Sequence, residues 1–134
     1  MTLWILLVLG LWVVQTFLPT TMFYLTSDAA ARGQYIHEHV RGRDNLPPDP
    51  VYTARAKRAL NNLSEALPVF LGLALLHELH GDVPGTATLG AAVFFGARVL
   101  YVPAYLSAVP MVRSIIWTGG VAGLLMMAGP LVTG

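Results

Sequence analysis

The chain has 134 residues, of which 55% are hydrophobic and only 11% are charged, and its formal net charge is +1. Because a soluble domain carries about 25% charged residues, this composition excludes an ordinary water-soluble domain and predicts an integral membrane protein. The chain has no cysteine, which excludes disulfides, thiolate catalysis by the protein itself and cysteine-based metal sites.

The first predicted element is an uncharged apolar run at about residues 3–25. A membrane-spanning helix needs about 20 apolar residues, so this run is long enough to cross. A cleaved signal peptide is the alternative, because Ala29, Ala30 and Ala31 resemble a cleavage site. We favour the span, since a signal peptide has a basic start and an apolar run of only about 7–15 residues.

A polar loop is expected at residues 26–52, and its end, NLPPDPVY, contains three prolines. Proline lacks an N–H group and biases the preceding residue away from helix, so this end is predicted to be extended or turned. Further spans are predicted at about 53–77, 86–106 and 112–132, separated by the turn HGDVPG (80–85) and by Pro110. The sequence therefore predicts an all-α fold, with a single transmembrane domain over residues 1–134 that contains four helices.

Basic residues are concentrated in and beside the first loop. They are Arg32, Arg41, Arg43, Arg55, Lys57 and Arg58, six of the eight in the chain. Arg113 flanks the third loop, whereas the second loop has Glu78 and Asp82 and no lysine or arginine. The positive-inside rule then places loops one and three in the cytoplasm.

Polar residues enter the second predicted span along one face. Arg58, Asn62 and Glu65 advance by four and three residues, which is the spacing of one side of a helix. If the helix enters the lipid near Arg55 or Arg58, Glu65 lies about 10–15 Å deep at about 1.5 Å per residue. This depth approaches the middle of a hydrocarbon core about 30 Å thick. Because a charge there costs about 2.5–3.5 kcal/mol, Glu65 is expected to face protein or a water-filled cleft.

The third span carries Arg98 at a similar depth, with Tyr101 and Tyr105 on the same face. One interpretation is a buried Glu65–Arg98 ion pair that locks two helices, with the tyrosines as ordinary interface aromatics. The other is a polar, net-positive cavity for an anionic ligand that has an amine for Glu65. His77 and His80 lack an acidic partner to complete a metal site, so no bound metal is expected.

Three stretches together resemble the MAPEG family, the membrane-associated proteins of eicosanoid and glutathione metabolism. They are RAKRALNNLSEALPVF (55–70), GARVLYVPAYL (96–106) and VPMVRS (109–114). The loop RGRDNLP (41–47) looks like that of bacterial members. The resemblance implies a four-helix bundle in a bacterial inner membrane, assembled as a homotrimer. It also implies that glutathione binds between subunits near the cytoplasmic side and that a lipophilic substrate arrives from the membrane lipids.

The resemblance also assigns roles to residues. Arg113 and Ser114 match the pair near the glutathione thiol and are the expected catalytic residues. The expected glutathione-binding residues are Arg58, Asn62, Glu65, Arg98, Tyr101 and Tyr105. The chemistry agrees, because arginine forks onto carboxylates and Glu65 suits the ammonium group of glutathione.

The resulting hypothesis is a glutathione transferase or peroxidase of detoxification that uses glutathione as co-substrate, with no metal and no nucleic acid partner. A non-catalytic, lipid- or ligand-binding member of the family is the alternative, because Asn61 stands where the family pattern has an arginine. A third possibility is a small proton-coupled exporter with Glu65 as proton carrier. The surrounding arginines argue against it, since they would hold Glu65 ionised.

Overall fold

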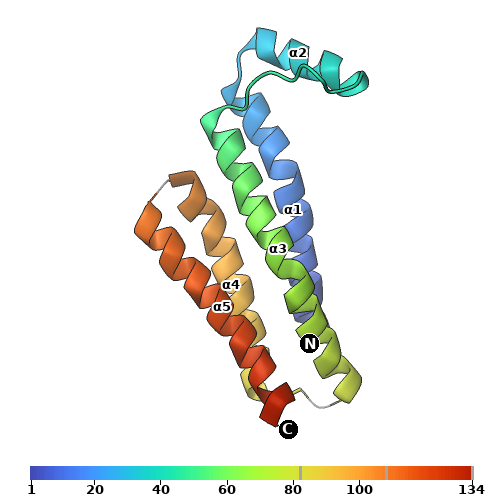
Figure 1. Ribbon diagram of the computed structural model, residues 1–134, viewed down its shortest axis with the longest axis vertical. Coiled ribbons are helices and arrows are strands. Elements are labelled where there is room, and N and C mark those ends of the chain that lie inside the picture. Colours follow the sequence, from blue (N-terminus) through green and yellow to red (C-terminus); the bar gives the residue numbers. More distant parts are fainter. Residues whose placement is uncertain (82, 108, 134) are drawn as a thin grey trace.

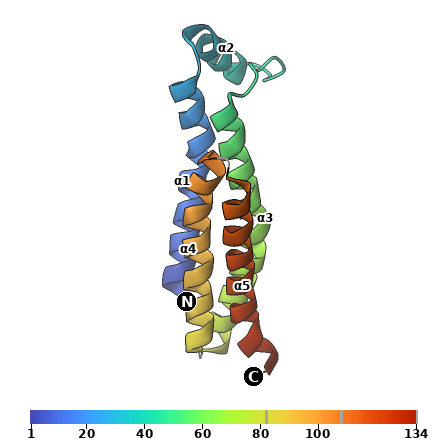
Figure 2. The same cartoon turned by 90° about the vertical axis from the view of Figure 1, so that its left-hand side faces the viewer.

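The computed structural model describes residues 1–81, 83–107 and 109–133. Within these ranges the chain forms α1 (Thr2–Thr26), α2 (Ala29–Val40), α3 (Val51–His80), α4 (Gly85–Ser107) and α5 (Pro110–Thr133). The four long helices form a bundle, and α2 lies across one end of it (Figures 1 and 2). The start of α1 and the end of α5 lie towards the opposite end. Asp82, which was assigned to the second loop, lies outside the described residues.

Four helices are long and apolar enough to cross a membrane: α1, α3, α4 and residues Met111–Thr133 of α5. No strand is present in the part of the chain that the structure describes. These observations confirm the predicted all-α membrane bundle. The helix α3 has 30 residues, or about 45 Å, and so extends beyond a hydrocarbon core of about 30 Å.

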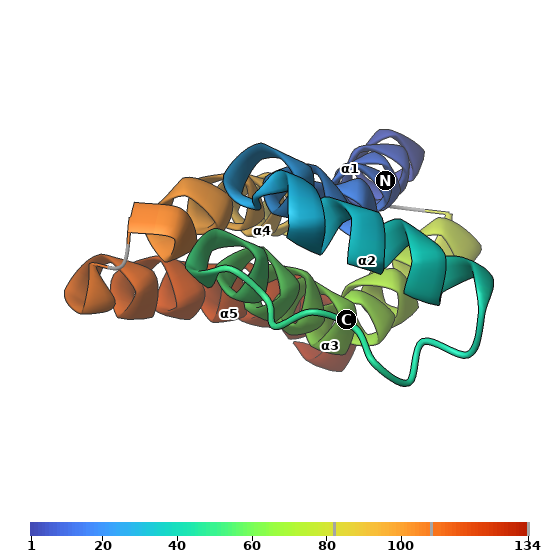
Figure 3. The same cartoon turned by 90° about the horizontal axis from the view of Figure 1, so that it is seen from above.

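The polar loop expected at residues 26–52 contains a helix that was not predicted. Asp28 caps α2, because its Oδ1 atom accepts a hydrogen bond of 2.7 Å from the backbone N–H of Ala31. The proline-containing residues 46–50 have no regular secondary structure, and α3 begins directly after Pro50. Figure 3 shows α2 lying across the end of the bundle.

The bundle packs as two helix pairs, α1 with α3 and α4 with α5. Phe70 of α3 stacks on Phe94 of α4, with ring centroids 4.8 Å apart, and joins the pairs. Gly90 and Gly123 let α4 and α5 approach closely, since a Cβ atom on Gly90 would lie 2.6 Å from the carbonyl oxygen of Gly123. Small residues commonly permit such contacts between membrane helices.

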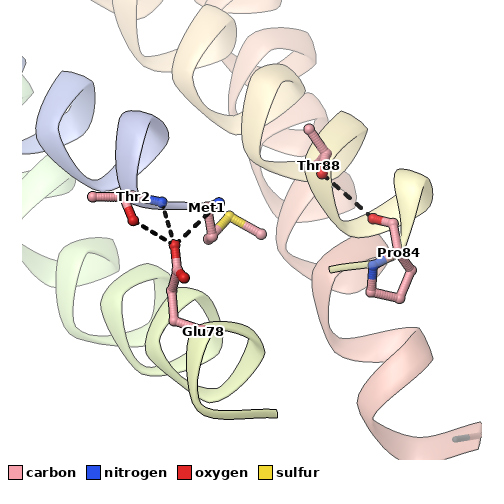
Figure 4. Close-up of polar contacts among 5 residues, drawn as sticks. All are labelled: Met1, Thr2, Glu78, Pro84 and Thr88. Atoms are coloured by element: carbon pink, nitrogen blue, oxygen red, sulfur yellow. Dashed lines mark hydrogen bonds and ion pairs between the residues drawn. The ribbon is translucent and has the colours of Figure 1, made fainter. Parts of the chain in front are cut away.

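Polar contacts hold the end of the bundle that lies away from α2. Glu78 of α3 accepts hydrogen bonds from the backbone N–H of Thr2 at 2.5 Å and from its hydroxyl at 2.6 Å, and pairs with the amino group of Met1 at 3.1 Å (Figure 4). The buried His77 lies 2.7 Å from the carbonyl oxygen of Met127 in α5 through its Nε2 atom. The candidate site lies nearer the other end, where α3 and α5 begin and α4 ends.

Candidate functional site

Arg98 is at the centre of the predicted site and is only 3% exposed. Its Nη1 atom donates a hydrogen bond to Oδ1 of Asn62 in α3. The guanidinium also lies 4.9 Å from the ring centroid of Phe94 and 5.8 Å from that of Tyr101, within the range of cation–π attraction. Gly120 of α5 lies beside it, where a Cβ atom would be in ordinary van der Waals contact at 3.5 Å from Nη2. Arg98 therefore connects α3, α4 and α5.

Of the two interpretations of Glu65 and Arg98, the structure does not show the one in which they form a buried ion pair. Glu65 makes no ion pair with any residue that the structure describes, and Arg98 bonds to Asn62 instead. The physical reason is the position of the two side chains around α3: Asn62 is half-buried against the bundle, whereas Glu65 is exposed. The Nε atom of Arg98 is buried and has no hydrogen-bond partner within the described chain, so this cation is only partly satisfied.

Two arginines from different helices lie against the ring of Tyr105. The guanidinium carbon of Arg113 in α5 is 4.8 Å from the Tyr105 ring centroid, and that of Arg58 in α3 is 5.9 Å away. Tyr101 meets the same ring edge-on at 5.4 Å. In addition, Arg55 donates a hydrogen bond of 2.7 Å to the carbonyl oxygen of Leu106, which satisfies a backbone group at the end of α4.

Two neighbouring cavities are formed by these residues. The first has a volume of ≈ 440 Å³ and is lined by Tyr101, Tyr105, Arg113, Ser114, Trp117 and Thr118. The second has a volume of ≈ 230 Å³ and is lined by Asn62, Glu65, Ala66, Arg98, Trp117, Val121 and Leu124. Seven of the eight predicted site residues therefore line one cavity or the other, and the eighth, Arg58, contacts the ring of Tyr105.

Trp117 and Thr118 line the site but were not predicted from the sequence. Trp117 lies four residues after Arg113 and borders both cavities. Thr118 lies four residues after Ser114, and its hydroxyl donates a hydrogen bond of 2.9 Å to the Ser114 carbonyl oxygen. Residues four apart share a helix face, so this spacing is the signal that could have identified them.

The side chains of the site carry three guanidinium groups, from Arg58, Arg98 and Arg113, and one carboxylate, from Glu65. Such a set favours a ligand that is anionic overall and contains an amine. Among the described residues, no group of three or more His, Cys, Asp or Glu side chains could hold a metal ion.

Comparisons with known proteins relate this helix bundle to a family of membrane proteins. The model of the MAPEG family matches residues 1–133. The chain is 36% identical over 83 residues to microsomal glutathione S-transferase 1 of Homo sapiens, covering 61% of this chain and 48% of that protein. It is 44% identical over 57 residues to the protein of the same name from Sus scrofa, covering 42% of this chain and 36% of that protein.

The matches thus extend over about half the length of these curated relatives, or less. No solved structure gives a significant match to the chain. The family match, in contrast, extends over nearly every residue, from the start of α1 to the end of α5. This chain belongs to the MAPEG family.

Proposed function

We propose that this chain is a membrane-embedded glutathione transferase with peroxidase capacity, and that it activates the glutathione thiol as a thiolate. The observation that carries the proposal is the ≈ 440 Å³ cavity in which Arg113, Ser114 and Tyr105 meet, open on the α4–α5 side of a bundle of helices long enough to span a membrane. The similarity to proteins named microsomal glutathione S-transferase 1 supports the same ligand.

Glutathione offers two carboxylates, one ammonium group and a thiol. Arg58 and Arg98 suit the carboxylates, because a guanidinium binds a carboxylate through two parallel hydrogen bonds. Glu65, which is exposed and without an ion-pair partner in the described chain, suits the ammonium group. Asn62 already holds Arg98 in place, so this part of the site is preorganised before the ligand binds.

Arg113 and Ser114 are proposed to act on the thiol. A free thiol has a pKa of about 8.5, and lowering it by two units requires about 2.7 kcal/mol of stabilisation of the thiolate. Both residues lie in the first turns of α5, where backbone N–H groups without helical partners give a positive end to the helix dipole. The permanent charge of Arg113 adds to this effect.

The proposed transferase and peroxidase reactions both begin from the glutathione thiolate. The thiol proton leaves to solvent, the thiolate sulfur forms a bond to an electrophilic carbon, and the leaving group departs with its electron pair. With a lipid hydroperoxide, the thiolate attacks oxygen and the O–O bond breaks, and the hydroperoxide is released as an alcohol. A second glutathione then reduces the oxidised sulfur, which yields glutathione disulfide and water.

A homotrimer is part of the proposal, with glutathione bound between adjacent subunits. Glu65 and Arg58 are exposed on the single chain although both lie in a membrane-spanning helix. Exposing these charged side chains to lipid is energetically unfavourable. A neighbouring subunit that covered them would remove this unfavourable contact. The lipophilic second substrate would enter from the bilayer, past exposed apolar residues such as Ile115. We further propose a bacterial inner-membrane location and a role in detoxification.

A non-catalytic, ligand-binding role is the second candidate, and Asn61 is the observation that favours it. Asn61 is exposed on α3 and stands where the family pattern has an arginine, so the site has one cation fewer for the carboxylates. Under this alternative, purified protein binds glutathione but turns over no second substrate. The substitution Asn61→Arg would then strengthen binding without producing activity.

Turnover tests the proposal directly. Detergent-solubilised protein, first shown to bind glutathione, is assayed with a panel of hydrophobic electrophiles and lipid hydroperoxides beside the variants Arg113→Ala and Arg41→Ala. Arg113→Ala is expected to lower kcat by about 10²-fold, in the range for loss of one charge-stabilising group. Arg41→Ala removes a charge outside the site and is expected to leave kcat unchanged. Binding without turnover in any assay would refute the transferase and favour the second candidate.

A further inference from the structure

Two more cavities flank α2, away from the proposed glutathione site. One has a volume of ≈ 350 Å³ and includes His39, Arg43, Asp49 and Lys57 in its lining. The other has a volume of ≈ 360 Å³ and includes Phe17, Thr20, Tyr24, Ile36 and Val40. The rings of Tyr35 and His39 line both cavities and therefore form their common boundary.

Aromatic stacking fixes this boundary to the end of α1. The Tyr35 ring lies 4.3 Å from that of Phe23 and 4.1 Å from that of His39, and the Tyr24 ring meets it edge-on at 5.9 Å. Phe23 is buried. Each such ring pair contributes about 0.5–1.5 kcal/mol, so α2 is held against α1 by packing. Figure 3 shows the resulting position of α2 across the end of the bundle.

The length of α1 would bring the apolar cavity near the surface of a membrane that this helix spans. The helix α1 has 25 residues, or about 37 Å, so its final turns reach the edge of a hydrocarbon core of about 30 Å. Ile36 and Val40 lie four residues apart on α2 and are 54% and 84% exposed. An apolar stripe on a short polar helix is typical of a helix that lies in the membrane interface. Lipid chains, rather than water, are then the medium that meets this cavity.

The polar cavity contains a cationic side chain that forms no ion pair within the described part of the chain. Lys57 pairs with Asp49 at 2.5 Å, but Arg43 makes no ion pair with any described residue. The Nδ1 atom of His39 is buried and has no hydrogen-bond partner in the described part of the chain. One carboxylate against two permanent cations leaves a net positive charge, which fits the phosphate of an acidic lipid headgroup.

We propose that α2 and the end of α1 bind one anionic phospholipid of the surrounding bilayer. Its phosphate lies in the cavity of His39, Arg43 and Lys57, and an acyl chain lies along Phe17, Thr20 and Val40 on the other side of the shared rings. A zwitterionic lipid fits the apolar cavity equally well but gains less from the net positive one. The site is separate from the glutathione cavities and does not depend on the proposed catalytic function.

Lipid retention by the intact protein tests this site. Native mass spectrometry is used to compare phosphatidylglycerol with phosphatidylcholine of the same acyl chains, added to the purified, detergent-solubilised protein. The variant Arg43→Asn removes the guanidinium while keeping the left-handed backbone at this position, where φ is 60°, because asparagine tolerates that conformation. Arg41→Asn is the matched control, since it removes the same charge two residues away and outside the cavity.

The expected result is preferential retention of phosphatidylglycerol by the wild type and by Arg41→Asn. Arg43→Asn should bind it about fivefold more weakly, as expected for one basic side chain at an anionic surface. Filling the apolar cavity by Thr20→Trp should lower the retention of both lipids. This second variant keeps the test decisive if Arg43→Asn fails to fold, as judged by circular dichroism.

Three results would overturn the proposal. The first is equal retention of the two lipids, or equal effects of Arg41→Asn and Arg43→Asn. The second is displacement of phosphatidylglycerol by inorganic phosphate, which would identify a soluble anion as the ligand. The third is a change in oligomeric state, without a change in lipid retention, on Thr20→Trp, which would show that another copy of the chain covers the cavity.

Discussion

Arg98 illustrates how one buried cation can organise a site inside a membrane bundle. It is 3% exposed, bonds to Asn62 and lies against the rings of Phe94 and Tyr101. Burying a cation is costly unless hydrogen bonds and neighbouring groups compensate. Asn62 supplies the acceptor that the structure shows for this side chain, and its amide is thereby fixed for contact with a ligand.

We predict that Asn62→Leu lowers the free energy of unfolding by about 1–3 kcal/mol, because Arg98 is then left buried without its acceptor. Asn61→Leu is the matched control, since Asn61 is exposed one residue earlier on α3 and should change stability little. Thermal unfolding in detergent measures both. Equal losses for the two variants would contradict the role given to Asn62.

For these residues, the sequence predicted the face of α3 that carries the site but not the hydrogen bond between Arg98 and Asn62. The spacing of Arg58, Asn62 and Glu65 was sufficient to group them with Arg98. It could not show that Arg98 bonds to the amide rather than to the carboxylate, since positions 62 and 65 differ by only about 60° around a helix. Trp117 was missed because an aromatic residue in an apolar span carries no sign of its neighbours.

Among the helices, α4 and α5 form the closest pair, and glycine makes that contact possible. A Cβ atom on Gly123 would lie 2.7 Å from the carbonyl oxygen of Gly90 and 2.8 Å from the backbone nitrogen of Phe94. These neighbours are backbone atoms and cannot rotate away. The contact therefore limits how closely the helices that carry Tyr105 and Arg113 can approach each other.

We expect Gly123→Ala to destabilise the protein by about 1–3 kcal/mol through overpacking and to weaken glutathione binding by moving α5. Gly129→Ala, also on α5, is the control, because a Cβ atom there meets nothing within 4 Å. Thermal unfolding and glutathione titration of both variants provide the measurement. Unchanged stability of Gly123→Ala would mean that the helices pack less closely than described.

Hydropathy predicted the four long helices but not α2. Its sequence, AAARGQYIHEHV, is short and polar, and a helix of 12 residues is marginal by itself in water. The local Asp28 cap and the stacking of Tyr35 on Phe23 of α1 stabilise it here. The stacking contact with α1 leaves no periodic signal in the segment itself.

For the whole molecule, the distribution of charge predicts how the bundle is oriented in the membrane. The basic residues near α2 predict that this end, together with the proposed site, faces the cytoplasm. Under the proposed function, cytoplasmic access would supply glutathione from the cell interior, while the apolar flanks of the bundle would meet the lipophilic substrate. The orientation therefore bears directly on the proposed function.

The absence of cysteine makes this orientation easy to test. We predict that Asn45→Cys, beside α2, reacts with a membrane-impermeant maleimide only after the cells are opened. Thr86→Cys, near the start of α4, should react in intact spheroplasts. Both positions are exposed, so neither result should be limited by burial. The reverse labelling pattern would invert the topology and place the site on the outer side.

The most direct test of the central claim is calorimetric titration of the purified, detergent-solubilised protein with glutathione, beside Glu65→Gln and Arg113→Ala. We predict micromolar to low-millimolar binding by the wild type. Glu65→Gln should weaken it about tenfold or more, because a charge-assisted hydrogen bond of about 1.5–3 kcal/mol is lost. Arg113→Ala should retain most of the affinity, since its proposed action is on the thiolate. No binding at cellular glutathione concentrations would contradict the assignment of these cavities to glutathione.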